Sequence, residues 1–220
     1  PRAKLTNKKI CDLMRAAIKK MGAPEDLVIG IETPSLETTN ELMQQCDLVL
    51  ATGGGAMVNA AYSSGTPALG VGVGNAVITV DETADLDAAA EKIRISKTLD
   101  LAASCSSDNS VILLDGIYDT MLDKLKAEGG YVCSAEEKTA LRHTLWDDEL
   151  HINTAMVAQP PEKIAQMAGL TIPDGVQFFI VLEDGYGPEH PFSGEKLSVI
   201  MALYRARDID HAIELTRHIQ

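Results

Sequence analysis

The segment Asp47-Leu-Val-Leu-Ala-Thr-Gly-Gly-Gly-Ala-Met57 joins a short apolar run directly to three glycines and then to helix-forming residues. Short apolar runs bounded by turn residues are typical of buried strands, and glycines let the chain turn sharply into a helix. Exposed N–H groups at such a helix N-terminus favour an anion. The segment predicts a strand-to-helix unit of an α/β protein, and either a phosphate site or a purely structural turn at its glycines.

Helix and strand patterns alternate outward from this unit, which predicts parallel sheets with crossover helices. A glycine-rich run that ends near Gly74 and Asn75 marks the expected boundary between two α/β subdomains, 1–74 and 75–220. The expected strands are 27–32, 47–52, 67–71, 77–80, 111–114, 177–182 and 199–204.

Composition narrows the class of protein. Hydrophobic residues make up 45% of the 220 residues, so a sizeable core can form, while the net charge of −13 disfavours nucleic-acid binding. No apolar run approaches the ~20 residues needed to span a bilayer. The four cysteines form no CxxC pair and no zinc pattern, which favours a reduced, cytoplasmic protein. The histidines show no metal-ligand spacing, and no metal site is predicted.

The segment Ser104-Cys-Ser-Ser-Asp-Asn-Ser110 places a cysteine among small polar residues just before an apolar strand. The thiol of Cys105 can be accessible there, and nearby N–H groups can stabilise its thiolate. The alternative is an inert, buried cysteine, which is the common role of this residue type. For Cys11, Cys46 and Cys133 we expect that core role.

Two further segments contain residues suited to a ligand. The alternating glycines of Gly70-Val-Gly-Val-Gly-Asn75 let the backbone approach a ligand closely, or simply make a bend between domains. In Ser193-Gly-Glu-Lys-Leu-Ser198, the carboxylate of Glu195 can accept hydrogen bonds from a ribose diol, or it is a solvated loop residue.

Taken together and in order, these four segments resemble the aldehyde dehydrogenase superfamily, and within it the CoA-acylating branch. The resemblance runs through essentially the whole chain and implies an aldehyde dehydrogenase-like α/β fold. Residues 1–74 would be the C-terminal part of the nicotinamide cofactor-binding domain, and 75–220 part of the catalytic domain. The chain resembles a fragment that lacks the family's N-terminal part.

The resemblance also implies roles for five residues. Cys105 falls at the position of the nucleophilic cysteine that attacks the aldehyde carbonyl. Gly53, Gly54 and Gly55 would line the phosphate side of NAD or NADP, and Glu195 would hold the nicotinamide ribose.

Hydrolytic members of this family carry a water-activating glutamate in a Glu-Leu-Gly-Gly-Lys motif. Aligning the chain through Asp85 puts Val71 at that position, 34 residues before Cys105. A valine cannot take a proton, so the resemblance implies slow hydrolysis and CoA as the acyl acceptor. One departure lies close to the cysteine, where relatives usually read Phe-Asp-Asn and this chain reads Leu99-Asp-Leu101.

The implied function is oxidation of a short aldehyde to an acyl-CoA through a thioester on Cys105. The sequence of 104–110 most resembles that of acylating sulfoacetaldehyde dehydrogenases, so sulfoacetaldehyde is the expected substrate. The alternatives are an acylating acetaldehyde dehydrogenase, a non-catalytic nucleotide-binding fragment, and a phosphate-dependent relative such as glutamyl phosphate reductase. The resemblance further implies a homo-oligomer whose partners are a small aldehyde and CoA.

Overall fold

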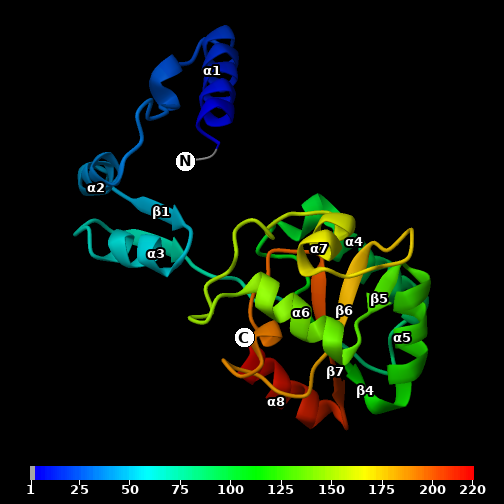
Figure 1. The fold of residues 1–220 in the computed structure, drawn as a ribbon. Coiled ribbons are helices and arrows are strands. Elements are labelled where there is room, and N and C mark those ends of the chain that lie inside the picture. Colours follow the sequence, from blue (N-terminus) through cyan, green and yellow to red (C-terminus); the bar gives the residue numbers. More distant parts are fainter. Residues whose placement is uncertain (1–2) are drawn as a thin grey trace. The chain divides into compact units, whose positions relative to one another are not determined.

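The computed structural model describes residues 3–220 and divides the chain into two compact units, the first ending at Val73 and the second beginning at Gly74 (Figure 1). Both units contain helices and parallel strands, which confirms the expected α/β fold class. The roles assigned to 1–74 and 75–220 stay a prediction. Among the described residues, no helix is both long and apolar enough to cross a membrane.

The first unit is built around two parallel strands, β1 and β2, which pair from Val49 opposite Ala68. Its small core consists of Met43, Val49, Ala51 and Ala61. Strand β1 runs into helix α3 through the three glycines, so the predicted strand-to-helix unit is confirmed. The elements are α1 (Lys4–Lys20), η1 (Glu25–Leu27), α2 (Leu36–Gln45), β1 (Val49–Thr52), α3 (Gly55–Tyr62) and β2 (Ala68–Val71).

The predicted strand at 27–32 is wrong. The chain there forms the end of the 3-10 helix η1 and then an irregular segment, and the side chain of Ile29 is 76% exposed. A strand requires a partner for its backbone hydrogen bonds, and in this sheet β1 and β2 pair only with each other. Apolar, β-branched residues indicate a preference for strand structure. Whether a strand forms also depends on a partner strand from another part of the chain.

The second unit contains a five-stranded parallel sheet in the order β3-β4-β7-β6-β5. Helix α5 packs on β4 and β5, α8 packs on β3, β4 and β7, and α6 packs against α7. Its strands are β3 (Val77–Val80), β4 (Ser110–Leu114), β5 (Gly130–Val132), β6 (Phe178–Leu182) and β7 (Ile200–Ala206). Its helices are α4 (Leu86–Thr98), η2 (Leu99–Ala102), η3 (Asp115–Ile117), α5 (Tyr118–Ala127), α6 (Ala135–Leu145), α7 (Pro161–Ala168), η4 (Pro191–Ser193) and α8 (Ile209–Ile219).

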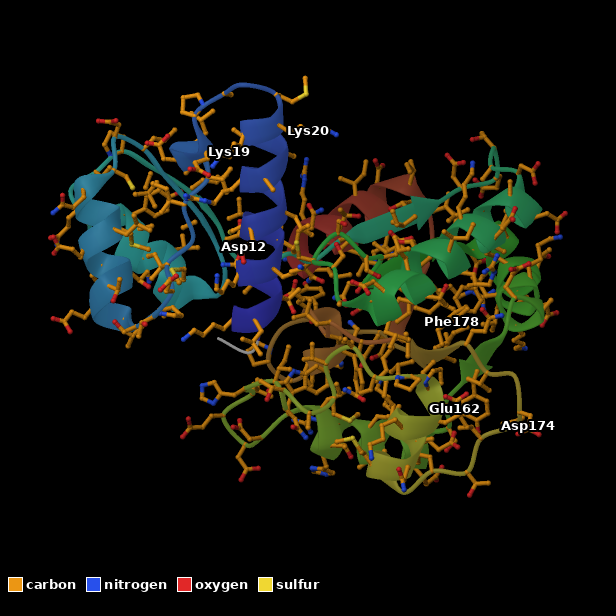
Figure 2. All side chains as sticks on the ribbon, turned by 90° about the horizontal axis from the view of Figure 1, so that it is seen from above. Asp12, Lys19, Lys20, Glu162, Asp174 and Phe178 are labelled. Carbon is orange, nitrogen blue, oxygen red and sulfur yellow. The ribbon has the colours of Figure 1, made fainter. Side chains whose placement is uncertain are left out.

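The main core surrounds the central strands of this sheet, and every residue of β4 is buried. Figure 2 shows Phe178 inside the second unit, whereas Asp174 projects from its surface. The rings of Trp146 and Phe192 meet edge to face with 5.0 Å between their centroids. Such aromatic packing is worth about 1 kcal/mol beyond the buried area. It anchors the segment that leads from η4 to Glu195.

Candidate active site

Three segments that the sequence singles out meet at one edge of the sheet. Gly74 lies just before β3, Cys105 just before β4, and Glu195 just before β7. These strands are parallel neighbours in the order β3-β4-β7, so the residues that precede them gather at the same edge. The topology therefore brings Cys105 and Glu195 together in the second unit, while Gly53, Gly54 and Gly55 belong to the first unit.

Cys105 occupies the tip of a tight turn. The backbone N–H of Ser107 donates to the carbonyl of Ser104 over 3.1 Å, which puts Cys105 at the second position of that turn. The cysteine is free and exposed. Among the residues that the structure describes, no acceptor bonds the Cys105 N–H. The turn thus presents a thiol and an unpaired N–H group side by side.

The chain after the turn is held firmly on α4. The hydroxyl of Ser107 donates to the carbonyl of Ser96 over 2.9 Å, and the N–H of Asp108 donates to the Ser96 hydroxyl over 3.0 Å. Asn109 donates its N–H to the carbonyl of Ala76 over 2.9 Å. Ser107, Asp108 and Asn109 are all buried. Only the tip with Cys105 therefore remains open to solvent.

The chain before the turn is strained. Asp100, Leu101 and Ala102 have φ angles of 52°, 54° and 56°, in the left-handed region. A residue other than glycine pays roughly 1–2 kcal/mol for this conformation, and asparagine tolerates it better than leucine does. Leu101, which stands where the resemblance places an asparagine, lacks that tolerance, so its surroundings must hold this conformation. Ala102 is fully buried in that approach.

Gly74 packs directly against the nucleophile segment. A Cβ atom added to Gly74 would lie 2.6 Å from the Cys105 carbonyl oxygen and 3.1 Å from its Cβ atom. Any side chain at position 74 would therefore displace backbone, which a glycine avoids. The N–H of Gly74 also donates to Oε1 of Glu195 over 3.1 Å. Gly74 thus links the candidate nucleophile to the candidate ribose ligand.

Glu195 is half-buried, and burial raises the pKa of its carboxyl group, while the hydrogen bond from Gly74 opposes that rise. Its second oxygen, Oε2, receives no hydrogen bond from the described part of the chain. A carboxylate with one oxygen fixed and one available suits the two hydroxyls of a ribose. The residues present therefore fit the nicotinamide ribose that the resemblance implies.

The glycine segment of the first unit has open space above it. Gly54 caps helix α3 and Gly55 begins it, and no atom lies within 4 Å of a Cβ added to either glycine. Both line a pocket of about 470 Å³ whose other walls are mainly apolar side chains of α2 and α3. Free N–H groups beside an apolar pocket fit a nucleotide phosphate and its attached ring. Gly53 lies beneath, packed against Met57.

Two buried lysines support the site, and neither is among the site residues predicted from the sequence. Nζ of Lys196 donates to the carbonyls of Phe192 and Gly194 over 2.5 and 2.9 Å. Burial lowers the pKa of Lys97 to about 7, against the attraction of Asp108. Burial, and then the repulsion from Lys97, also lower the pKa of Lys196.

The sequence does hold a signal for Lys97. It follows Ile93 by four residues, on the stripe of α4 that faces the core. A lysine on a buried stripe indicates a polar environment inside the fold.

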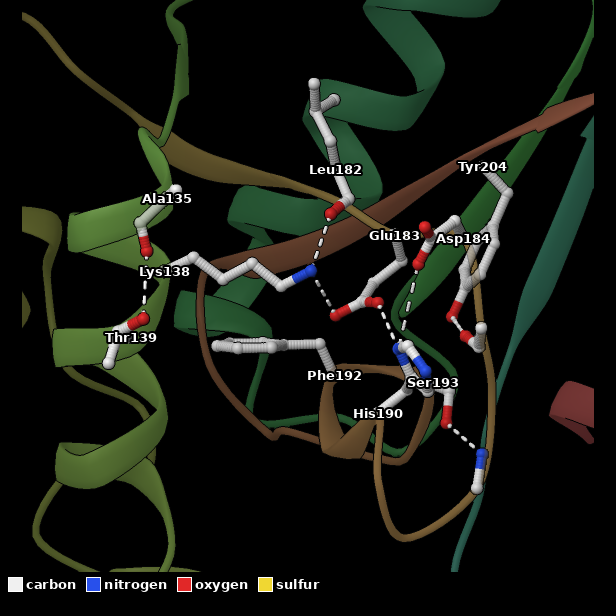
Figure 3. Close-up of polar contacts among 12 residues, drawn as sticks. Ala135, Lys138, Thr139, Leu182, Glu183, Asp184, His190, Phe192, Ser193 and Tyr204 are labelled. Carbon is white, nitrogen blue, oxygen red and sulfur yellow. Dashed lines mark hydrogen bonds and ion pairs between the residues drawn. The ribbon is translucent and has the colours of Figure 1, made fainter.

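The loop that leads to Glu195 is fastened by a buried carboxylate (Figure 3). One carboxylate oxygen of Glu183 lies 2.8 Å from Nζ of Lys138, and the other lies 3.0 Å from Nδ1 of His190. Further along the loop, the N–H of Gly187 donates to the hydroxyl of Ser193 over 3.0 Å. His190 thus has a structural partner, and the segment before Glu195 is tied to β6.

Replacing Lys97 with methionine should reveal the cost of the buried ammonium. Its ordinary pKa of 10.5 falls to about 7 on folding, which corresponds to about 5 kcal/mol below pH 7. Between these two values the unfolded state keeps a proton that the folded state has lost, so wild-type stability rises with pH. We expect Lys97→Met to raise the free energy of unfolding most near pH ~6 and least above pH ~9, in urea titrations followed by circular dichroism.

The exposed Lys92 on the same helix provides the control, because Lys92→Met should leave the stability-versus-pH curve unchanged. A constant stability difference between Lys97→Met and the wild type across this pH range would contradict the lowered pKa.

The chain is similar in sequence and in fold to known proteins. The model of the aldehyde dehydrogenase family matches residues 3–132. The acylating sulfoacetaldehyde dehydrogenase of Cupriavidus necator is 43% identical over 217 residues, which cover 97% of this chain and 44% of that enzyme. The solved structure of an acetylating aldehyde dehydrogenase from Geobacillus thermoglucosidasius superposes with a TM-score of 0.92 at 37% identity, covering 96% of this chain and 47% of that one.

A propionaldehyde dehydrogenase from Rhodopseudomonas palustris, solved with bound CoA and an acylated cysteine, superposes with a TM-score of 0.90 at 28% identity. The superposition covers all of this chain and 50% of the Rhodopseudomonas chain. The chain thus spans about half the length of these three relatives, and 24% of a longer one. The matching family model, the identity to curated relatives and the shared fold agree: the chain belongs to the aldehyde dehydrogenase family.

Proposed function

We propose that the protein is a CoA-acylating aldehyde dehydrogenase that oxidises a short aldehyde with NAD or NADP to an acyl-CoA. The observation that carries this proposal is the exposed thiol of Cys105 beside its unpaired N–H group, on a turn whose following residues are held by hydrogen bonds. Gly74, which contacts Cys105, donates its N–H to Glu195. The acylating chemistry named for the relatives supports it.

In the first step the Cys105 thiolate adds to the aldehyde carbonyl. The new S–C bond converts the carbonyl oxygen into the oxyanion of a thiohemiacetal. The unpaired N–H of Cys105 can donate to that oxyanion, because the turn already holds it at the same exposed tip. Such a donor typically contributes 10²–10³-fold in rate.

In the second step the oxyanion collapses to a carbonyl, the aldehydic hydrogen leaves as hydride, and a thioester remains on Cys105. When bound, the oxidised nicotinamide supplies the hydride acceptor. Glu195 would hold the nicotinamide ribose with the oxygen that Gly74 leaves available. Gly53, Gly54 and Gly55 line the phosphate side, for which the open N-terminus of α3 gives support.

In the third step the CoA thiolate attacks the thioester, a new S–C bond forms to CoA, and the Cys105 thiolate leaves. Val71, at the end of β2, offers no group that can take a proton from water. Hydrolysis should therefore be slow, while a thiol with its own thiolate population needs less help. This difference is the reason to propose CoA as the acyl acceptor.

Sulfoacetaldehyde is the proposed aldehyde. The sequence of 104–110 and the identity to the Cupriavidus enzyme support it. Acetaldehyde is the second candidate, favoured by the similarity to the acetylating Geobacillus enzyme. Assembly as a homo-oligomer and a cytoplasmic setting stay predictions from the resemblance and from the cysteine spacing.

The test of the mechanism is NADH formation from sulfoacetaldehyde by the full-length protein, with and without CoA. We expect CoA-dependent turnover that Cys105→Ala abolishes, because the variant has no nucleophile. Cys46→Ala is the matched control and should keep the activity. Turnover that is independent of CoA would contradict the interpretation of Val71, and turnover with phosphate instead of CoA would favour a phosphate-dependent relative.

The choice of aldehyde is tested by comparing kcat/KM for sulfoacetaldehyde with that for acetaldehyde at saturating CoA. We expect a clear preference for sulfoacetaldehyde, because the segment 104–110 resembles that of the acylating sulfoacetaldehyde dehydrogenases. Equal or better turnover of acetaldehyde would rule out the sulfonate substrate and retain the acylating mechanism.

A non-catalytic nucleotide-binding role predicts no special reactivity at Cys105. We expect iodoacetamide to label Cys105 faster than Cys11 and Cys46, which are half-buried, and far faster than Cys133. Burial raises the pKa of the Cys133 thiol to about 12, so it stays protonated at neutral pH. Peptide mapping by mass spectrometry measures the four rates, and a Cys105 rate no higher than the others would favour the non-catalytic role.

A further inference from the structure

Two asparagine side chains connect the segments that carry Cys105 and Glu195. We infer that Asn75 and Asn109, together called the amide clamp, are positioning residues that set the Cys105 thiol relative to Glu195. The inference rests on the proposed function for its kinetic test. It names residues that act through the backbone of their neighbours, without touching substrate.

Asn75 uses all of its side-chain groups in the clamp. Its Nδ2 donates to the carbonyl of Ser193 over 2.8 Å and to that of Ile219 over 2.5 Å. Its Oδ1 accepts a hydrogen bond from Nδ2 of Asn109. A single side chain therefore joins the start of β3 to the segment before Glu195 and to the end of α8.

Asn109 uses both of its side-chain N–H groups. One is donated to Asn75, and the other goes to the carbonyl of Gly194 over 2.5 Å. Its backbone is fixed as well, because its carbonyl accepts the N–H of Ala202 in β7 over 3.1 Å. The side chain is only 4% exposed. Loss of these donors would leave Oδ1 of Asn75 without its hydrogen bond and the carbonyl of Gly194 with Lys196 as its donor.

The hydrogen bonds of the clamp lie between the segment of Cys105 and the segment of Glu195. Asn109 lies four residues after Cys105, and Asn75 directly follows Gly74, which touches the Cys105 backbone. Of the three backbone carbonyls that accept hydrogen bonds from the amides, those of Ser193 and Gly194 belong to the two residues before Glu195. The clamp therefore joins the segment of Cys105 to the segment of Glu195, beside the direct contacts of Gly74.

The proposed oxidation depends on the distance between the Cys105 thiol and the Glu195 carboxylate, whereas acylation of the thiol does not. Hydride leaves a carbon bound to Cys105 and must reach a nicotinamide whose ribose is held by Glu195. A misplacement of about 1 Å between reacting atoms can cost about 100-fold in rate. Attack of Cys105 on an activated ester requires only the thiol. The clamp should therefore control the first reaction far more than the second.

Asn75→Asp and Asn109→Asp are the test variants, because aspartate keeps the shape of asparagine and replaces two N–H donors with an acceptor. We expect CoA-dependent NADH formation to fall about 100-fold in each variant. Acylation of Cys105 by p-nitrophenyl acetate without nicotinamide, read as the burst of p-nitrophenolate, should stay near the wild-type rate. The primary isotope effect with aldehyde deuterated at C1 should rise, since hydride transfer becomes slower.

Asn153→Asp is the matched control. That exposed side chain also donates from Nδ2 to a carbonyl, of Thr144 over 2.9 Å, and accepts the N–H of Ala155 over 3.1 Å. Its bonds lie in the loop after α6, and we expect both reactions to keep their wild-type rates. Oxidation that survives in the clamp variants, or a proportional fall of both reactions, would overturn the inference.

Hydrogen exchange measured by mass spectrometry tests the clamp without any turnover. In Asn109→Asp we expect faster exchange in both 104–110 and 193–196, and in Asn153→Asp no change in either segment. Unchanged exchange in the clamp variant would overturn the inference. A wild-type protein that forms no NADH with CoA would instead contradict the proposed function, and exchange would still decide the clamp.

Discussion

The parallel pairing of three adjacent strands, β3, β4 and β7, is the constraint on which the site depends. Parallel neighbours must begin at the same edge of a sheet, so the segments that precede them are forced together. Gly74, Cys105 and Glu195 lie far apart in the sequence and meet for this reason alone. The fully buried β4 between its two partners makes that arrangement costly to disturb.

Side-chain chemistry then refines what the strands bring together. Gly74 allows backbone contact with Cys105, and hydrogen bonds from Ser107 and Asp108 hold the chain after the turn on α4. Only the tip is left without partners, which is where a nucleophile must meet its substrate. In the proposed reaction, the fixed segment under the exposed thiol would reduce the entropy lost when the thiol is positioned for attack.

The sequence predicts the fold class and the segments of the site better than it predicts their support. The apolar run before Gly53 and the polar segment around Cys105 are local signals, and both led to the observed elements. The strand expected at 27–32 was wrong because pairing is a property of the sheet. Asn75 gave no clear signal, since its partners Ser193 and Ile219 are distant in sequence, whereas Lys97 gave one only through its place on the buried stripe of α4.

Lys196 shows how stability and site geometry are connected. Its side chain is fully buried, and burial lowers its pKa, which means that folding disfavours the charged form of this amine. In return its Nζ satisfies the carbonyl of Gly194, the same oxygen that accepts Asn109, and the carbonyl of Phe192. A hydrophobic side chain of similar size would avoid the desolvation cost, but it would leave the carbonyl of Phe192 without this donor and that of Gly194 with Asn109 as its donor. We therefore attribute the buried lysine to the positioning of the segment before β7, and not to the stability of the core.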